Sequence, residues 1–176
     1  LCGAVGAALC GMVASLTTGK KKYASVEREI QHLLKSTNAL HDKLLDQVRA
    51  DAEGFQPLSR AYAIPREDPT RAAVLQSAAE TACTAPLEIM ALCAAALSAV
   101  GRLAEIGSRL AVSDAGCAAA ILRGALEAAA LNVLVNTKTM TDRSAADHLN
   151  ARCFALLDQG RTDGERIFCA VRDQLV

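Results

Sequence analysis

Residues 26–62 read VEREIQHLLKSTNALHDKLLDQVRADAEGFQPLSRAY and form the longest amphipathic stretch of the chain. Core-type residues recur at intervals of three and four throughout, which is the spacing of one face of an α-helix. At 1.5 Å per residue, such a helix would be about 55 Å long. A face of this length needs partners of comparable length, so the stretch predicts an elongated antiparallel helix bundle. This face, called the seam below, comprises Val26, Ile30, Leu33, Leu34, Thr37, Leu40, Leu44, Val48, Phe55, Leu58 and Tyr62.

Turn signals divide the rest of the chain into further helical segments, and none of these has the alternating, β-branched pattern of a strand. The sequence therefore predicts an all-α fold of about five long helices, in a single domain over residues 1–176. Elongated bundles commonly bury further surface by twofold dimerisation, which we also expect here. The signals are Gly19, the prolines Pro65 and Pro69, the segment EIGSRLAVSDAG at 105–116, and TDRSAAD at 141–147.

Composition narrows the class of protein. Hydrophobic residues make up 52% of the chain and aromatic residues only 3%, so alanine and leucine must supply a core of closely packed helices. Lysine plus arginine equals aspartate plus glutamate at 19 each, and without a basic excess nucleic acid is not an expected partner. Seven scattered cysteines, with no CxxC spacing, argue against a disulfide scaffold and a metal site. They indicate a reducing compartment, which we take to be the cytoplasm.

The first sixteen residues, LCGAVGAALCGMVASL, could be taken for a membrane span. They are shorter than the roughly 20 residues that a spanning helix needs, and no basic segment precedes them. Gly3, Ala7 and Gly11 recur every four residues and form a smooth face that another helix can approach closely. We therefore expect a buried core helix and no membrane partner.

Asp51 is the most informative polar residue because it lies in the middle of the seam. At 100° per residue, it falls within about 20° of both Leu44 and Leu58. A carboxylate inside an apolar stripe is costly unless it is paired or hydrogen-bonded. Two interpretations stay open: a structural ion pair or hydrogen bond inside the bundle, or a desolvated acid suited to general acid–base catalysis.

Three more polar residues mark one face of the segment from about 115 to 140. Asp114 precedes the helical run and is interpreted first as its N-cap. Asn132 lies five turns further on and points the same way, with Asn136 one turn beyond. Two amides on a buried face need hydrogen-bond partners, which they would find across helices or on a polar heterocycle. We take both as candidate binding residues.

Lys20, Lys21 and Lys22 follow Gly19 directly. Cations at this place complement the negative end of the preceding helix dipole. Capping needs at most one or two of them, so the run is also a candidate partner for carboxylates.

These segments also carry a resemblance to a known family. GAVGAALCGMVASLTTGKKKY, VRADAEGF, SDAGCAAA and LNVLVN occur here in the order and spacing of the cyclodeaminase/cyclohydrolase family of folate enzymes, which includes the C-terminal half of formiminotransferase-cyclodeaminase. The chain resembles this family over nearly its whole length. Family members carry a Gly-rich, PGGGS-type stretch just before the first helix, and this chain begins after it.

The resemblance implies an all-α homodimer that acts on one-carbon adducts of tetrahydrofolate, with the folate as substrate and no tightly bound cofactor. The activity implied first is closure of 5-formiminotetrahydrofolate to 5,10-methenyltetrahydrofolate with release of ammonia. The alternative is hydrolysis of the methenyl compound to 10-formyltetrahydrofolate, and a second alternative is a non-catalytic interaction module of the same fold. Both reactions pass through a tetrahedral carbon between N5 and N10, and both need a group that takes and returns protons.

By this resemblance, Asp51 is the first candidate for proton transfer and Asp114 the second. Asn132 and Asn136 are implied as ligands of the pterin or the reacting centre, and the three lysines as ligands of the glutamate tail, which often carries several glutamates. In an up-down bundle the lysines and Asp114 lie near one end, whereas Asp51 and the two asparagines lie towards the other. An antiparallel dimer would bring one protomer's lysine end beside its partner's Asp51, so we expect a site at or near the dimer interface.

Overall fold

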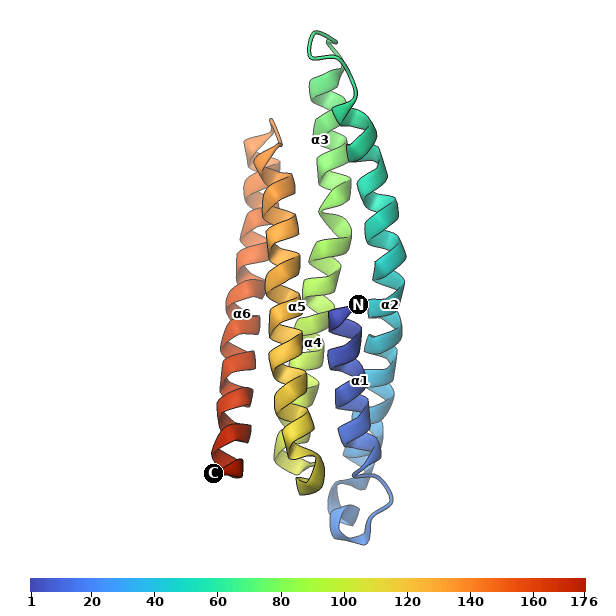
Figure 1. Ribbon diagram of the computed structural model, residues 1–176, viewed down its shortest axis with the longest axis vertical. Coiled ribbons are helices and arrows are strands. Elements are labelled where there is room, and N and C mark those ends of the chain that lie inside the picture. Colours follow the sequence, from blue (N-terminus) through green and yellow to red (C-terminus); the bar gives the residue numbers. More distant parts are fainter.

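The computed structural model describes all residues 1–176 as an elongated bundle of helices without strands (Figure 1). Two short 3-10 helices, η1 (Lys21–Val26) and η2 (Arg109–Ala111), lead into two of the long ones. Because α3 and α4 follow one another as a single rod with a break at Cys83, the bundle consists of five rods, and the predicted all-α fold of about five helices is confirmed. The α-helices are α1 (Cys2–Ser15), α2 (Glu27–Tyr62), α3 (Arg71–Ala82), α4 (Thr84–Ile106), α5 (Val112–Lys138) and α6 (Arg143–Leu175).

Rods that follow one another along the chain run in opposite directions, whereas α4 runs parallel to α1 and α6, which it also contacts (Figure 1). Helix α5 packs on α1, α4 and α6, and α2 packs on α1, α3 and α4. The lower end in Figure 1 holds η1, the α4–α5 turn and the C-terminus, whereas the upper end holds the α2–α3 and α5–α6 connections. The N-terminus lies at mid-height, because α1 is much shorter than the rods beside it.

Helix α1 is the buried core helix that the sequence predicts, held by close contacts between small residues. A Cβ added at Gly3 would lie 2.9 Å from Cys93 Sγ of α4, and one at Gly6 would lie 2.6 Å from Leu122 Cγ of α5. Only glycine therefore allows these backbones to approach so closely.

Two segments, Arg71–Ile106 and Arg109–Lys138, have the length and apolar composition of a membrane-spanning helix. Core helices of water-soluble bundles have the same composition. In the first segment, 67% of the most apolar window is buried inside the bundle, and in the second only 39%. The low value for α5 reflects an apolar outer face that no other helix of the chain covers.

The seam of α2 is buried over its lower half and again at Leu58, which is 1% exposed, but not between them, so the prediction of a continuous buried seam was wrong. Ile30, Thr37 and Leu44 are buried, whereas Val48 and Phe55, on the same face, are each 51% exposed. The difference arises because α1 covers this face of α2 only as far as its own N-terminus (Figure 1).

Alanine at Gly6 tests the close packing of α1. We expect Gly6→Ala to destabilise the protein, because overpacking costs about 1–3 kcal/mol and the gain in helix propensity offsets only about 1 kcal/mol. Gly54→Ala in α2 is the matched control, because the nearest atom to the added Cβ, the Thr81 carbonyl oxygen, lies at an ordinary van der Waals distance of 3.7 Å. We expect this control to raise the free energy of unfolding, as measured by urea denaturation. Equal effects of the two changes would contradict the packing described for α1.

Candidate functional site

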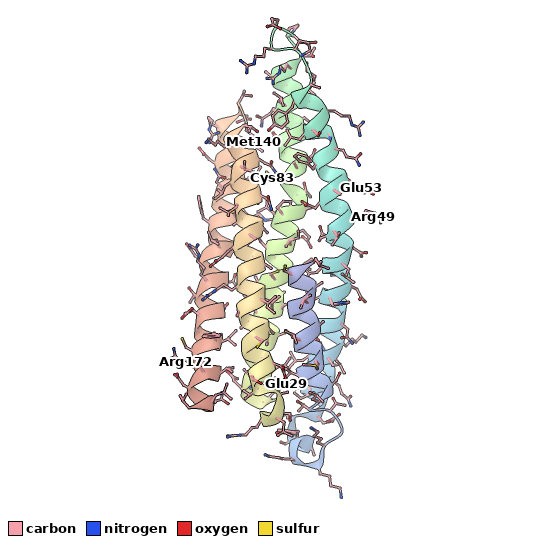
Figure 2. The ribbon with its side chains drawn as sticks, viewed as in Figure 1. Glu29, Arg49, Glu53, Cys83, Met140 and Arg172 are labelled. Carbon is pink, nitrogen blue, oxygen red and sulfur yellow. The ribbon has the colours of Figure 1, made fainter.

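Asp51 lies on the bundle side of α2, above the end of α1. Arg49 and Glu53 form an exposed pair, with Nε 3.7 Å from Oε1, on the opposite side of the helix. Figure 2 shows these two side chains pointing away from the other helices. Asp51 itself is exposed and forms no ion pair, so neither the buried ion pair nor the desolvated acid is found in the single chain. This part of α2 lies above the residues of α1 and is uncovered in the single chain (Figure 1).

Asn132 occupies the corresponding place on α5. It continues the row of α5 residues that faces α1, beyond the point where α1 ends, and is therefore exposed rather than buried. Its Nδ2 makes one long hydrogen bond, 3.4 Å, to the Ala128 carbonyl of its own helix. It lines a groove of about 470 Å³ between α1 and α5, whose other walls are mostly apolar and include Leu1 and Ile121.

Asp51 and Asn132 lie at nearly the same height in the bundle. Leu44 contacts the position of Gly3, and Leu122 contacts that of Gly6. Counting 1.5 Å per residue from these contacts places both polar residues about 10 Å above the level of Gly3, on either side of the line of α1. We call Asp51, Asn132 and the N-terminal end of α1 the α1-end site.

Asn136, one turn above Asn132, has a structural partner. It is 9% exposed, and its Nδ2 donates to the Ala82 carbonyl at 3.1 Å. That carbonyl lacks a helical partner because Pro86, four residues on, has no N–H. The side chain thus satisfies the carbonyl left free at the break between α3 and α4, which is the cross-helix bond that the sequence left open as one of two interpretations.

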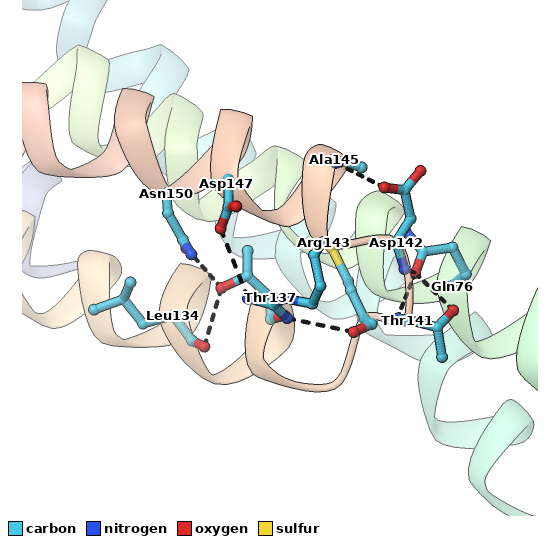
Figure 3. A network of polar contacts seen from close by, with 10 residues as sticks. Gln76, Leu134, Thr137, Thr141, Asp142, Arg143, Ala145, Asp147 and Asn150 are labelled. Carbon is cyan, nitrogen blue, oxygen red and sulfur yellow. Dashed lines mark hydrogen bonds and ion pairs between the residues drawn. The ribbon is translucent and has the colours of Figure 1, made fainter.

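A polar network holds the upper part of α5 in place (Figure 3). Gln76 Oε1 of α3 accepts hydrogen bonds from the backbone N–H groups of Thr141 and Asp142, at 2.8 and 3.0 Å. Thr137 Oγ1 donates to Asn150 Oδ1 of α6 at 2.7 Å. These bonds tie the α5–α6 turn to α3 and so set the position of the helix end that carries the two asparagines.

Asp114 and the three lysines lie at the other end of the bundle. Asp114 is inside the first turn of α5, and Ala111 occupies the N-cap without a side-chain bond, so the predicted N-cap role of Asp114 was wrong. The cause is η2, which leads the chain into the helix before Asp114 is reached. About 27 Å of α5 separates Asp114 from Asn132. The α1-end site therefore includes only one of the two candidate acids.

Of the three lysines, Lys22 lines a cavity of about 420 Å³ at the lower end, together with Tyr23 and Arg109. All three lysines are exposed, and Gly19 before them has a left-handed φ of 75° in the turn after α1, four residues beyond its last residue, Ser15. The sequence did not indicate Arg109, because its approach to Tyr23 joins parts of the chain 86 residues apart. No group of three or more His, Cys, Asp or Glu side chains is placed to hold a metal ion.

Comparison with known proteins identifies relatives along most of the chain. The family model for formiminotransferase-cyclodeaminase matches residues 1–155. A methenyltetrahydrofolate cyclohydrolase from Methylorubrum extorquens is 36% identical over 177 residues, which cover 98% of this chain and 85% of that protein. A formimidoyltransferase-cyclodeaminase from Sus scrofa is 31% identical over 163 residues, covering 90% of this chain but only 30% of the pig protein.

The fold is also that of a solved structure. The crystal structure of a formiminotetrahydrofolate cyclodeaminase from Thermotoga maritima matches with a TM-score of 0.90, over 99% of this chain and 85% of that one. At 24% sequence identity this match shows likeness of fold.

The two asparagines should differ sharply in their effect on stability. Asn136→Ala leaves the buried Ala82 carbonyl without a partner, and we expect a loss of about 1–3 kcal/mol in the free energy of unfolding. Asn132→Ala, on the exposed side of the same helix, should stay within about 0.5 kcal/mol of the parent. Thermal and urea unfolding of the two variants measures the difference. A stable Asn136→Ala protein would mean that the hydrogen bond to Ala82 contributes nothing.

Proposed function

The chain belongs to the formiminotransferase-cyclodeaminase family, and from this premise we propose that it hydrolyses 5,10-methenyltetrahydrofolate to 10-formyltetrahydrofolate. The observation that carries the proposal is the 36% identity to a methenyltetrahydrofolate cyclohydrolase along nearly the whole of this chain and most of that one. The sequence motifs alone put the cyclodeaminase reaction first. That reaction is the second candidate, favoured by the relatives named formimidoyltransferase-cyclodeaminase, whose length this chain spans to only 30%.

The α1-end site offers the groups that this hydrolysis requires. The methenyl carbon, bonded to both N5 and N10, shares a positive charge with them, which the carboxylate of Asp51 attracts. Asp51 takes a proton from the water that attacks this carbon, and the adduct is tetrahedral. The same carboxyl group returns the proton to N5 as the C–N5 bond breaks, and the hydroxyl proton of the adduct passes to water as the C=O bond forms. This leaves the formyl group on N10, with net release of one proton. The amide of Asn132 and the apolar groove beside it suit a flat heterocycle with polar edges.

We further propose that two chains pair with twofold symmetry through the outer faces of α1 and α5. Residues 1–19 contain no charged residue, and large side chains such as Val5, Met12 and Leu131 are 48%, 40% and 68% exposed. Between Asp114 and Lys138 the only charged residues of α5 are Arg123 and Glu127, which pair with Glu165 and Arg161 of α6. The uncovered face of α5 therefore carries no charge, which favours its burial against a second copy.

Pairing of this kind would complete the site as well as bury the face. A second chain lying over α1 and α5 would cover the exposed Val48 and Phe55 and remove Asp51 from water. In an antiparallel pair it would also bring the partner's lysine end towards Asp51. Because all seven cysteines are free, we place the dimer in a reducing compartment, the cytoplasm.

Replacing the carboxyl group of Asp51 tests the proposed chemistry. Asp51→Asn keeps the shape of the side chain and removes the proton acceptor, so we expect turnover to fall by about 10²–10⁴-fold. Asp46→Asn, another exposed aspartate of α2 that points to the outer side, is the matched control and should keep full activity.

The absorbance of methenyltetrahydrofolate measures both reactions. Its loss from the methenyl compound indicates hydrolysis, and its appearance from the formimino compound indicates cyclisation with deamination. Undiminished turnover by Asp51→Asn would remove this residue from the mechanism. A parent protein inactive on both compounds would favour the non-catalytic interaction module.

A charge on the outer face of α5 tests the dimer. We expect Leu131→Glu to shift the protein from dimer to monomer, because a carboxylate would be buried at the interface, and to lower activity in parallel. Leu175→Glu, at the exposed end of α6, is the control and should leave both unchanged. Sedimentation velocity gives the oligomeric state. A parent protein that is monomeric and fully active would refute this interface.

A further inference from the structure

Phe55 is the aromatic residue nearest to Asp51 along α2. It lies four residues further on, about 6 Å along the helix axis and about 40° around it, so the two side chains leave the helix on the same side. Long side chains of a helix lean towards its N-terminus, which brings the ring of Phe55 back over the turn that carries Asp51. An aromatic face and a carboxylate therefore lie next to each other at the α1-end site.

The ring of Phe55 is open to a ligand. It is 51% exposed, and no cation of the chain occupies its face, since the one cation over an aromatic ring is Lys22, over Tyr23 at the lower end. Arg49, two residues from Asp51, pairs with Glu53 on the opposite side of α2. The sequences of α1, α3, α4 and α5 contain no aromatic residue, so α2 is the only helix around this site that offers a ring.

The substrates of both candidate reactions carry the same kind of charged group. In 5,10-methenyltetrahydrofolate the one-carbon unit is an amidinium, a planar cation shared by N5, the methenyl carbon and N10. The formimino group of 5-formiminotetrahydrofolate, which is protonated near neutral pH, is an amidinium as well. The formyl group of 10-formyltetrahydrofolate is neutral. A planar cation is attracted by a carboxylate and by the face of an aromatic ring, and the attraction grows where water is excluded.

We propose that Phe55 determines the preference of the α1-end site for the charged substrate over neutral folates, with its ring lying over the amidinium beside the carboxylate of Asp51. The inference rests on the proposed function for the identity of the ligand, and it holds for either candidate reaction. In the hydrolysis the cation is discharged as water attacks, so the ring stabilises the bound substrate more than the transition state. Its loss should therefore raise KM without lowering kcat.

The first arm of the experiment measures binding with a reporter at the site itself. The chain contains no tryptophan, so Phe55→Trp introduces a single indole. Its emission is followed while 5-formiminotetrahydrofolate or 5-formyltetrahydrofolate is added, in an Asp51→Asn background that keeps turnover low. The two probes differ only in carrying NH₂⁺ or O on one carbon, and we expect the cation to bind about tenfold more tightly. Tyr62→Trp is the control, because Tyr62 is 48% exposed on the same face but roughly 10 Å higher, and its emission should not respond.

Phe55→Leu removes the ring and keeps an apolar side chain. By calorimetry in the same Asp51→Asn background, we expect this variant to bind the two probes equally, whereas Phe55→Tyr should keep the preference for the cation. Equal weakening of both probes in Phe55→Leu would mean that the ring only fills space, and this result would overturn the proposal. So would an equal response of the reporters at positions 55 and 62.

The second arm uses steady-state kinetics with Asp51 intact. We expect Phe55→Leu to raise KM for methenyltetrahydrofolate about tenfold with kcat no lower, and Phe55→Tyr and Tyr62→Leu to behave as the parent does. Turnover with an unchanged KM in Phe55→Leu refutes the role of the ring and leaves the proposed function standing. Charge-selective binding without any turnover refutes only the proposed function. A parent chain that neither binds nor turns over these compounds refutes both.

Discussion

The close packing of α1 between its neighbours is the interaction on which the arrangement of the bundle depends. Fourteen residues without a charge lie between α2 and α5, and glycines at two positions bring the helix close enough to bury the faces of its neighbours. Above Leu1 the same two faces continue without cover. The polar residues singled out by the sequence, Asp51 and Asn132, lie just beyond this boundary.

A second constraint is the break at Cys83, where a proline removes one helical hydrogen bond and a side chain from another helix replaces it. Pro86 cannot donate to the Ala82 carbonyl, so the helical ladder loses one bond there. The amide of Asn136 restores that bond from another helix. The bond from Asn136 therefore links the rod of α3 and α4 to the upper half of α5. Gln76 of α3 makes a second link, to the turn that follows α5. The helix end that carries Asn132 is fixed at two points.

The fold was predictable from periodicity because its elements are long and their boundaries carry proline or glycine. Residues 26–62 were expected to form one helix, and α2 spans Glu27–Tyr62. The heights of the candidate residues followed from counting along an up-down bundle. Their burial did not, because the seam of α2 repeats regularly past the point where its partner stops. The sequence of residues 48–62 contains no signal that distinguishes the covered from the uncovered positions of the seam. Arg109 was missed for a related reason, since its place beside Tyr23 depends on how two turns at one end of the bundle meet.

The position of α1 in the chain has a consequence for how the protein is made. Its Gly6 packs on Leu122, 116 residues later, and much of its surface is buried only when α5 is in place. During synthesis α1 can pack on α2 soon after both are made, but its face towards α5 stays uncovered until residues 112–138 follow. Contacts of such long sequence separation form late and slow folding. Until α5 is made, the uncharged, apolar face of α1 stays exposed, and such a face is a natural binding site for chaperones that hold nascent chains.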